Sequence, residues 1–270
     1  MNRPEGENSD PASLIVKGSG AQLIRAELSG HDFANADLAR ANFLQAKLSG
    51  ANMACAILTD AVLFGANLNG VNLSGANMVG ADLREAYSAN GDFTYADLTD
   101  SWLNAAHFSD ANLSGANLSG SNLWRANFKN VNLADAILTG ANLTEFHSTG
   151  IVGTPEAFPE DWVLAGGCFI GPQASLNGVK LNGVNLAGVN LTGAHLSAAN
   201  LDGANLAGAN LAGASLNGTK LRGANLGGAD LRFADLRGAD LTGAILTGSN
   251  RRKSDVTNAV GFPRWRWWQP

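Results

Sequence analysis

The chain has 270 residues, of which 45% are hydrophobic and 15% are charged, and its formal net charge is −5. Its two cysteines, Cys55 within a repeat and Cys168 within an interruption, are not expected to form a bridge. These features argue against a disulfide-stabilised secreted scaffold. Residues 1–13 carry three acidic side chains and no apolar run, which predicts neither a secretory signal nor a membrane anchor. We therefore expect a soluble protein of the cytoplasm.

The first elements along the chain are a tail and cap at residues 1–20 and a run of five-residue repeats at residues 21–145. Each repeat holds a small residue, Asn or Asp, Leu, and two polar or tiny residues, as in Ala111–Gly115. The small position is broken at His31 and the large apolar position at Ser88. So regular a period is typical of an array in which each unit buries its apolar face by stacking on its neighbours.

A period of five fits neither the α-helix nor a plain β-strand, so each repeat must combine a short extended piece with a turn. In the repeat that contains Ala141 and Leu143, these two side chains are expected to point inward and Asn142 outward. Glycine fills the second corner position of many repeats, where a positive φ angle costs it little. A helical array is disfavoured because each Gly in a helix interior costs about 1 kcal/mol relative to Ala.

The repeat pattern stops at residues 146–173, which we predict to be an inserted loop because Leu143 and Leu176 are out of phase with the period. Thr154–Pro159 begins with a helix-capping residue followed by Pro, so a single helical turn is expected there. Trp162 then supplies an apolar anchor. The insertion is either a loop strapped onto one face of the array or a loop that binds a partner.

A second run of repeats occupies residues 174–258, where Leu fills the apolar position at every repeat up to Leu246. An open end of a stacked array exposes unpaired strand edges and leucines, so the aromatic tail at residues 259–270 is predicted to cap the array or form a dimer interface. Alternating Arg and Trp also occurs in segments that bind membranes or nucleic acids, although this segment is short for that role. The candidate cap or dimerisation residues are Phe262, Trp265, Trp267 and Trp268.

The pattern Ala-(Asp/Asn)-Leu-x-x resembles the pentapeptide-repeat family over most of the chain. The resemblance implies an all-β fold, a right-handed, four-sided parallel β-helix with four repeats per coil. About forty repeats then give about ten coils, interrupted by the one inserted loop. Each inward Leu contributes roughly 1.5–3 kcal/mol of burial, which supplies a sizeable core without disulfide or metal.

Four repeats per coil place residues twenty positions apart above one another, so columns of outward side chains can be predicted from the sequence. One corner column is unusually apolar for a surface. It is either a partner-binding stripe or a set of scattered apolar residues that the insertion partly covers. The column comprises Leu44, Phe64, Arg84, Asn104 and Trp124. Oppositely charged pairs at the same spacing are Glu27 with Lys47, Arg40 with Asp60, and Asp202 with Arg222.

A second zone of the first run also departs from the repeat consensus. Ser88 is expected to leave space inside a Leu column, which Phe108 and Phe128 of the same column would fill. The zone comprises Tyr87, Ser88, Gly91, Tyr95, Trp102 and His107.

Charge is divided unevenly between the two runs. Residues 21–145 hold twelve acids and six bases, whereas residues 174–253 hold four acids and eight bases. This polarity either steers a partner or reflects drift among solvated corner residues. The candidate acidic partner-binding residues are Asp82, Asp92, Asp97, Asp100 and Asp110.

No nucleophile, base and orienting group form a recognisable catalytic constellation, and the four histidines lack metal-ligand spacing. The sequence therefore predicts a non-enzymatic binding or scaffold protein that needs no cofactor or metal. We expect an unidentified protein partner and a homodimer formed through the C-terminus. Neither membrane binding nor direct nucleic-acid binding is expected.

The resemblance also implies an alternative function. Some pentapeptide-repeat proteins protect DNA gyrase or topoisomerase IV from quinolones or toxins by resembling duplex DNA in width and acidity. Asp32, Asp37 and Asp60, together with the candidate acidic residues, would then occupy the basic DNA-binding saddle of the enzyme. The basic residues of the second run, which would be repelled there, argue against this alternative.

Overall fold

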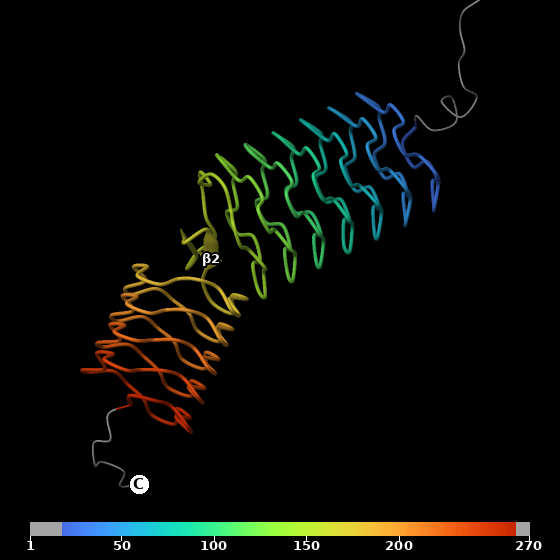
Figure 1. Ribbon diagram of the computed structural model, residues 1–270. Helices are drawn as coiled ribbons and strands as arrows, with labels where there is room; N and C mark the ends of the chain where they lie inside the picture. The colour runs from blue at the N-terminus through green and yellow to red at the C-terminus, as the bar shows by residue number, and fades with distance from the viewer. Residues whose placement is uncertain (1–17, 263–270) are drawn as a thin grey trace, which may run out of the picture. The chain divides into compact units, whose positions relative to one another are not determined.

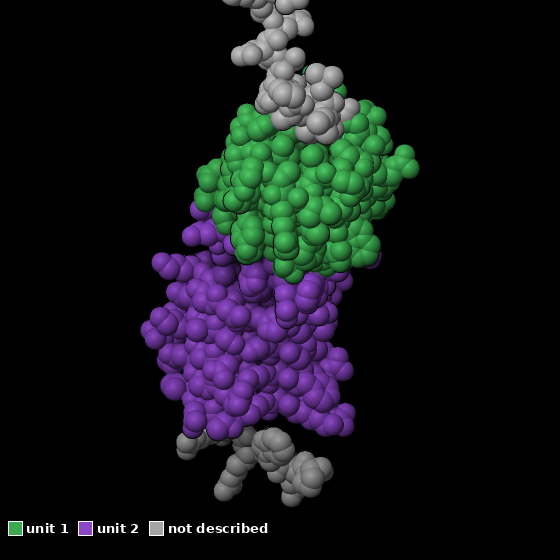
Figure 2. All heavy atoms as spheres, turned by 90° about the vertical axis from the view of Figure 1, so that its right-hand side faces the viewer, with its two compact units in different colours: residues 1–123, 131–141, 155–157 green, residues 124–130, 142–154, 158–270 purple. Residues whose placement is uncertain are grey.

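The computed structural model describes residues 18–262. The chain divides into two compact units, which Figure 2 draws in different colours. Unit 1 comprises Met1–Leu123, Val131–Ala141 and Pro155–Ala157. Unit 2 comprises Trp124–Asn130, Asn142–Thr154 and Phe158–Pro270. The division therefore falls within the first run of repeats as well as within the insertion. Most of the predicted cap at residues 1–20 lies outside the described residues.

In unit 1 the repeats form stacked coils joined by isolated parallel β-bridges, and Figure 1 shows these coils in blue to green. Bridged residues lie twenty positions apart, as in the series Asn52, Asn72 and Asp92. The Asn72 amide donates to the carbonyl of Ala51 at 2.9 Å, while its own carbonyl accepts from Met53 at 2.7 Å. Each coil is therefore hydrogen-bonded to its neighbour at every extended piece, and the interval of twenty residues spans four repeats.

The small and the large apolar position of each repeat both point into the core of unit 1. Leu118 is fully buried, whereas Asn117 beside it is half-buried and faces outward. Where the core holds Phe in place of Leu, rings pack edge to face, and the centroids of Phe93 and Phe108 lie 5.1 Å apart. Gly91 makes this packing possible, because a methyl group there would lie 2.7 Å from Cε2 of Phe93.

Ser88 is fully buried, as its place in the apolar column predicts, and its hydroxyl has no hydrogen-bond partner among the described residues. Phe108, one of the two residues expected to fill the space beside it, is also fully buried in unit 1. Phe128, the other, belongs to unit 2, where its ring centroid lies 5.0 Å from that of Phe146. The interior of unit 1 thus tolerates one hydroxyl within its apolar column.

The second corner position adopts a left-handed backbone conformation whether or not it is glycine. Gly115 has a φ angle of 67°, and Tyr95 and Asp100 have φ angles of 57° and 55°. The outward Asn or Asp helps to hold the turn, as when Oδ1 of Asn117 accepts a hydrogen bond from the amide of Ser119 at 3.0 Å. Glycine is therefore favoured at these corners but is not required.

Unit 2 contains the second run of repeats, coloured yellow to red in Figure 1, with the same interval of twenty residues between bridge partners. Its outward asparagines form a ladder, in which Nδ2 of Asn205 donates to Oδ1 of Asn185 at 2.9 Å and Nδ2 of Asn225 donates to Asn205 at 3.3 Å. The inward leucines are buried throughout the run. This regularity follows from the nearly invariant sequence of the repeats.

The insertion contributes an antiparallel hairpin to unit 2, formed by β1 (Val163–Ala165) and β2 (Cys168–Ile170). Gly166 and Gly167 connect the strands with φ angles of 58° and 70°, as a two-residue hairpin turn requires. The ring of Phe169 packs edge to face on Phe146, with centroids 5.6 Å apart. These contacts bury β2 against unit 2, which is the arrangement expected of a strapped loop.

The helical turn predicted at Thr154–Pro159 is wrong. No helix occurs anywhere in residues 18–262, and Ala157 instead forms a parallel bridge with Ile137 in unit 1. The amide of Glu156 also donates to the carbonyl of Ala136 at 2.9 Å. Pairing with an available strand edge satisfies these backbone groups, and a single isolated helical turn has no comparable stabilisation.

Candidate partner-binding surface

A group of aromatic and charged side chains surrounds Arg84 on the surface of unit 1. Cζ of Arg84 lies 5.5 Å from the ring centroid of Phe64 and 5.8 Å from that of Trp102. Its guanidinium group donates to both carboxylate oxygens of Asp82, from Nε at 2.8 Å and from Nη2 at 2.7 Å. We call Phe64, Asp82, Arg84 and Trp102 the Arg84 cluster.

The repeat register brings these four residues together. Asp82 and Trp102 are bridge partners on successive coils. Phe64 and Arg84 occupy the same corner of successive coils, where the amide of Gly65 donates to the Arg84 carbonyl at 2.9 Å. A Trp at an outward bridge position therefore meets an Arg at the neighbouring corner of the coil before it.

The Asp82 carboxylate restrains Arg84 and raises its pKa above the ordinary value, chiefly through the side-chain hydrogen bonds. A guanidinium group held in this way forms favourable contacts with aromatic rings on either side of it. Trp102 nevertheless remains 51% exposed. The cluster thus presents a large aromatic surface whose side chains already restrain one another.

Further aromatic side chains are exposed elsewhere on unit 1. The rings of Tyr87 and His107 stack with centroids 5.1 Å apart and an interplanar angle of 4°. Tyr95 is 77% exposed, and its ring lies over Gly115, where a side-chain Cβ would come within 2.5 Å of it. Exposed Trp, Tyr and Arg side chains are the types most enriched among residues that dominate binding energy at interfaces.

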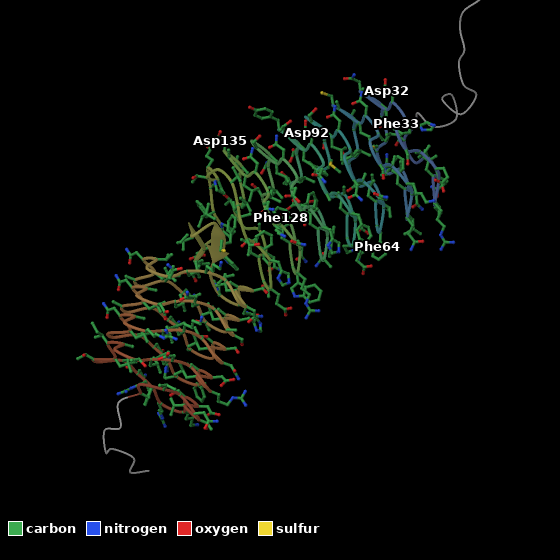
Figure 3. The ribbon with its side chains drawn as sticks, in the orientation of Figure 1. Asp32, Phe33, Phe64, Asp92, Phe128 and Asp135 are labelled. Carbon is green, nitrogen blue, oxygen red and sulfur yellow. The ribbon has the colours of Figure 1, made fainter. Side chains whose placement is uncertain are left out.

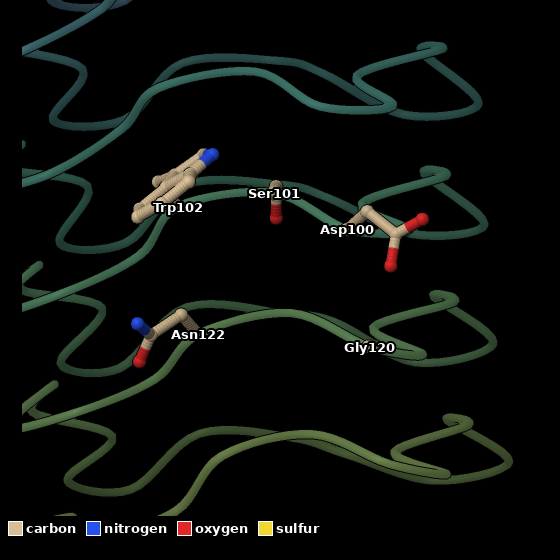
Figure 4. Close-up of a pocket in the computed structure, with 5 residues that line it drawn as sticks. All are labelled: Asp100, Ser101, Trp102, Gly120 and Asn122. Atoms are coloured by element: carbon tan, nitrogen blue, oxygen red, sulfur yellow. The ribbon is translucent and has the colours of Figure 1, made fainter.

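An open pocket of about 250 Å³ adjoins Trp102, and Figure 4 shows the residues that line it. The Ser101 hydroxyl donates to the Leu98 carbonyl at 2.7 Å, so it is already engaged. The carboxylate of Asp100 extends over Gly120, where any Cβ would overlap Oδ1 of Asp100. The lining residues are Asp100, Ser101, Trp102, Gly120 and Asn122.

Unit 2 pairs many of its basic side chains with neighbouring aspartates. The N–O distance is 2.6 Å between Arg232 and Asp230 and 2.7 Å between Arg237 and Asp235. Nε of Arg222 lies 2.6 Å from a carboxylate oxygen of Asp240. The hydroxyl of Thr242 and the guanidinium of Arg222 lower the pKa of Asp240 to about 2. The basic character predicted for the second run is therefore partly neutralised.

A profile of the family described as pentapeptide repeats matches this chain in eight copies. The matched residues are 19–53, 56–87, 106–145, 173–208, 190–228 and 224–260. The chain belongs to the pentapeptide-repeat family. Its fold is a right-handed β-helix, as the resemblance predicts. A comparison with curated proteins found no match.

Several solved pentapeptide-repeat structures are similar to this protein. HetL from the cyanobacterium Nostoc sp. strain PCC 7120, which is involved in heterocyst differentiation regulation, is 29% identical over 87% of this chain and 92% of its own, with a TM-score of 0.37. QnrB1, a plasmid-mediated fluoroquinolone resistance protein, is 18% identical over 74% of this chain and 88% of its own, with a TM-score of 0.34. Likeness at this level assigns no partner to the present pentapeptide-repeat protein.

Four residues of the corner column predicted from the sequence occupy the same corner of successive coils in unit 1, namely Leu44, Phe64, Arg84 and Asn104. Trp124 belongs to unit 2, where Cζ of Arg125 lies 4.3 Å from its ring centroid. The column is therefore divided between the units. Its role in binding a partner stays a prediction.

The five candidate acidic residues do not form one patch. Asp82, Asp92 and Asp97 belong to three different series of bridges, and Asp100 and Asp110 lie at two different corners. Figure 3 shows Asp92 and Phe64 on different sides of unit 1. Acidic side chains are thus distributed around this part of the pentapeptide-repeat array, and their role in binding also stays a prediction.

The aromatic C-terminal tail is described only at its start. Phe262 has a ring centroid 5.5 Å from Cζ of Arg251. Trp265, Trp267 and Trp268 lie outside the described residues. Capping and dimerisation by this tail remain predictions.

Two features of the surface escaped the sequence prediction. The repeat consensus identifies Trp102 as irregular but does not connect it with Arg84, although the register sets it beside Asp82 on the next coil. The short-range Asp-x-Arg pairs, of which Asp82 with Arg84 is one, were also missed. Applying the twenty-residue spacing to outward bridge positions as well as corners supplies the first signal.

Residues 18–262 contain no group of three or more His, Cys, Asp or Glu side chains that could hold a metal ion. The same residues include no helix with the length and apolar character needed to cross a membrane. Cys55 is exposed and Cys168 is buried, and both thiols are free.

Proposed function

We propose that this pentapeptide-repeat protein is a non-enzymatic binding or scaffold protein that contacts a partner protein through the Arg84 cluster. The observation that carries the proposal is Trp102, which is 51% exposed while Cζ of Arg84 lies 5.8 Å from its ring centroid. Large exposed aromatic side chains beside an Arg are typical of interface hot spots. Because Asp82 and Arg84 already restrain one another, binding costs little additional side-chain entropy.

Affinity capture from the native host, followed by mass spectrometry, tests this proposal. The wild-type chain should capture a partner protein. The Trp102→Ser and Arg84→Ala variants should each capture at least about tenfold less of it. Phe233→Asn is the matched control, because Phe233 is an exposed aromatic residue of unit 2 with Nζ of Lys253 at 5.3 Å from its ring centroid. Equal capture by the wild type and both unit 1 variants would overturn the proposal.

We infer in addition that each coil has four sides, one repeat to a side, and that the two runs together make about ten coils. The support is the interval of twenty residues between bridge partners in both units. A crystal structure tests the inference directly. Coils with three sides or with a different residue interval would contradict it.

We also propose a cytoplasmic homodimer formed through Phe262, Trp265, Trp267 and Trp268. The support is the aromatic composition of this tail, which suits the covering of an exposed end of a β-helix. Deletion of Phe262–Pro270 should convert the dimer to a monomer or an aggregating species in light scattering. A wild-type monomer whose truncated form stays soluble and equally stable would contradict the proposal, and cell fractionation tests the location.

Binding to DNA gyrase or topoisomerase IV as a mimic of duplex DNA is a second candidate function. The observation that favours it is the acidity of unit 1, whose described residues include twelve acids and four bases. The described residues of unit 2, with eight acids and ten bases, oppose it. Acidic side chains distributed around the coil suit a basic saddle better than a single patch does.

Inhibition of supercoiling by the host's own gyrase tests the second candidate. The protein should inhibit the enzyme or relieve quinolone poisoning, more weakly as salt rises, and Asp97→Lys with Asp100→Lys should abolish the effect. Both substitutions leave the apolar interior untouched because Asp97 and Asp100 lie on the outer surface. No effect on either topoisomerase at micromolar protein would remove this candidate.

A further inference from the structure

The pocket beside Trp102 combines an acidic group with an aromatic ring. The Asp100 carboxylate is exposed, and within residues 18–262 no side chain or backbone amide forms a hydrogen bond or ion pair with it. Trp102, two positions further along, also lines the pocket, and its indole and the Asp100 carboxylate lie on opposite sides of Ser101 (Figure 4). The Ser101 hydroxyl does not compete for a ligand, because the Leu98 carbonyl engages it.

In the Arg84 cluster, a carboxylate and an indole both contact a guanidinium group. There, the Arg84 guanidinium donates to the Asp82 carboxylate at 2.7 Å and 2.8 Å, and its Cζ lies 5.8 Å from the ring centroid of Trp102. Asp82 and Arg84 lie on the coil before Trp102, whereas Gly120 and Asn122 of the pocket lie on the coil after it. Asp100 lies on the same coil as Trp102, so a second carboxylate lines the pocket beside this indole, and no Arg is among the described residues that line it.

We propose that this pocket binds the guanidinium group of an arginine side chain presented by the partner protein. The proposal rests on the proposed function, because it names the chemistry that the surface around Trp102 recognises. A planar guanidinium stacks on an indole and offers two parallel donors to a carboxylate, which the compact ammonium of lysine does not.

Size and charge agree with this occupant. The pocket volume of about 250 Å³ is below the roughly 300–1,000 Å³ of sites for drug-sized molecules, so it suits one side chain. Twelve acids against four bases among the described residues of unit 1 attract a cation. Gly120 keeps the position over which Asp100 extends free of a side chain.

The test is a titration of the full-length protein with Nα-acetyl-arginine amide, followed by the NMR signal of the Trp102 indole N–H. Trp102→Phe assigns that signal by removing it. Nα-acetyl-citrulline amide, which has nearly the same shape without the charge, and Nα-acetyl-lysine amide serve as comparison probes. Because no natural partner is needed, the titration is independent of the capture experiment.

We expect the arginine amide to shift the Trp102 signal in a saturable way and to bind at least about tenfold more tightly than the citrulline amide. Asp100→Asn should remove this preference. Asp60→Asn is the matched control, because Asp60 has a φ angle of 56° and extends over Gly80 as Asp100 extends over Gly120, but Val62 follows it in place of Trp102. Asp60→Asn should leave the preference unchanged.

The proposal is overturned if arginine and citrulline amides shift the signal equally, if neither shifts it, or if Asp100→Asn binds like the wild type. A lysine amide that binds as tightly as the arginine amide would also overturn it, since the flat guanidinium would then have no role. In each case, reduced capture of a partner protein by the Trp102→Ser variant would still support the proposed function. The two proposals can therefore fail separately.

Discussion

The interiors of the two units follow the same repeat pattern, but the side chains on their outer surfaces differ. In the second run, between residues 174 and 250, only Ala198 and Phe233 replace glycine at the second corner position. In unit 1 that position often carries a side chain in the left-handed conformation, as at Tyr95, Asp100 and Ala105. A left-handed conformation costs a non-glycine residue roughly 1–2 kcal/mol. Unit 1 therefore carries non-glycine side chains at its second corner positions at a cost in stability that the second run largely avoids.

This difference separates the residues that maintain the fold from those available for recognition. Inward leucines and outward asparagines suffice for stacking, as the second run demonstrates. The exposed aromatic residues Trp102 and Tyr87, by contrast, depart from this outward asparagine pattern, and they occur in unit 1. Departures from the repeat consensus thus mark the surface on which a functional role is proposed.

The largest expected effect tests the shared interior. Leu118→Asp in unit 1 and Leu211→Asp in unit 2 each place an unpaired carboxylate in a fully buried apolar position, at a cost of about 5 kcal/mol. Both variants should therefore lose their cooperative thermal transition or melt at much lower temperature. Circular dichroism melts measure this loss.

The outward neighbours serve as controls for the two core substitutions. Asn117→Ala removes two hydrogen bonds from Ser119 and one to Thr99, and Asn210→Ala removes one from the Ala212 amide, each worth about 1 kcal/mol. If either alanine variant destabilises the protein as much as its aspartate neighbour, the inward and outward assignment is wrong.

A smaller change in the free energy of unfolding, of opposite sign in the two units, tests the cost of non-glycine residues at the second corner position. Gly213→Ala in unit 2 introduces a side chain at a φ angle of 67° with open space around it, so about 1 kcal/mol of stability should be lost through backbone strain alone. Ala105→Gly in unit 1, at a φ angle of 55°, should gain up to about 1 kcal/mol. Urea denaturation measures both, and changes of the same sign would contradict the comparison.

The smallest effect concerns the ion pairs of unit 2. The pKa of Asp240 is lowered to about 2 by Thr242 and Arg222. A lowered carboxyl pKa in the folded state stabilises the protein above the unfolded value near 4, and that contribution is lost as pH falls toward 2. Asp240→Asn should therefore lower the melting temperature at pH 5 and change it little at pH 2. An equal decrease at both pH values would show that the carboxylate charge is not responsible.

The period predicts a stacked array because one physical requirement, burial of the small and large apolar positions, repeats along the chain, whereas the right-handed β-helix follows from the resemblance to the pentapeptide-repeat family. Leu118 and Asn117 lie inside and outside as their positions in the repeat predict. Where the repeat stops, local sequence signals give a wrong prediction. Thr154–Pro159 has the sequence of a helix start, but Ala157 forms a bridge with Ile137. Tertiary pairing outweighs a capping signal in so short a segment.

The candidate surface was predicted only in part, because side-chain partners depend on geometry that spacing does not specify. Glu27 with Lys47 forms the expected ion pair at 2.7 Å. Within the described residues Arg40 and Asp60 form none, and the Asp202 carboxylate accepts from the Arg222 amide while the guanidinium pairs with Asp240. Flexible charged side chains pair with the nearest of several oppositely charged groups, and that group is often two residues away in the same repeat.

The affinity of the captured partner for paired variants, measured by isothermal titration calorimetry, tests the central claim most directly. Trp102→Ser should raise the dissociation constant at least about thirtyfold, as the loss of an aromatic hot spot does. Phe233→Asn should change the dissociation constant less than about twofold, because the second run of repeats has no part in the proposed recognition. Melting curves that match the wild type would show that both variants are folded. A partner that binds Trp102→Ser as tightly as the wild type, or that loses affinity with Phe233→Asn instead, would contradict the account.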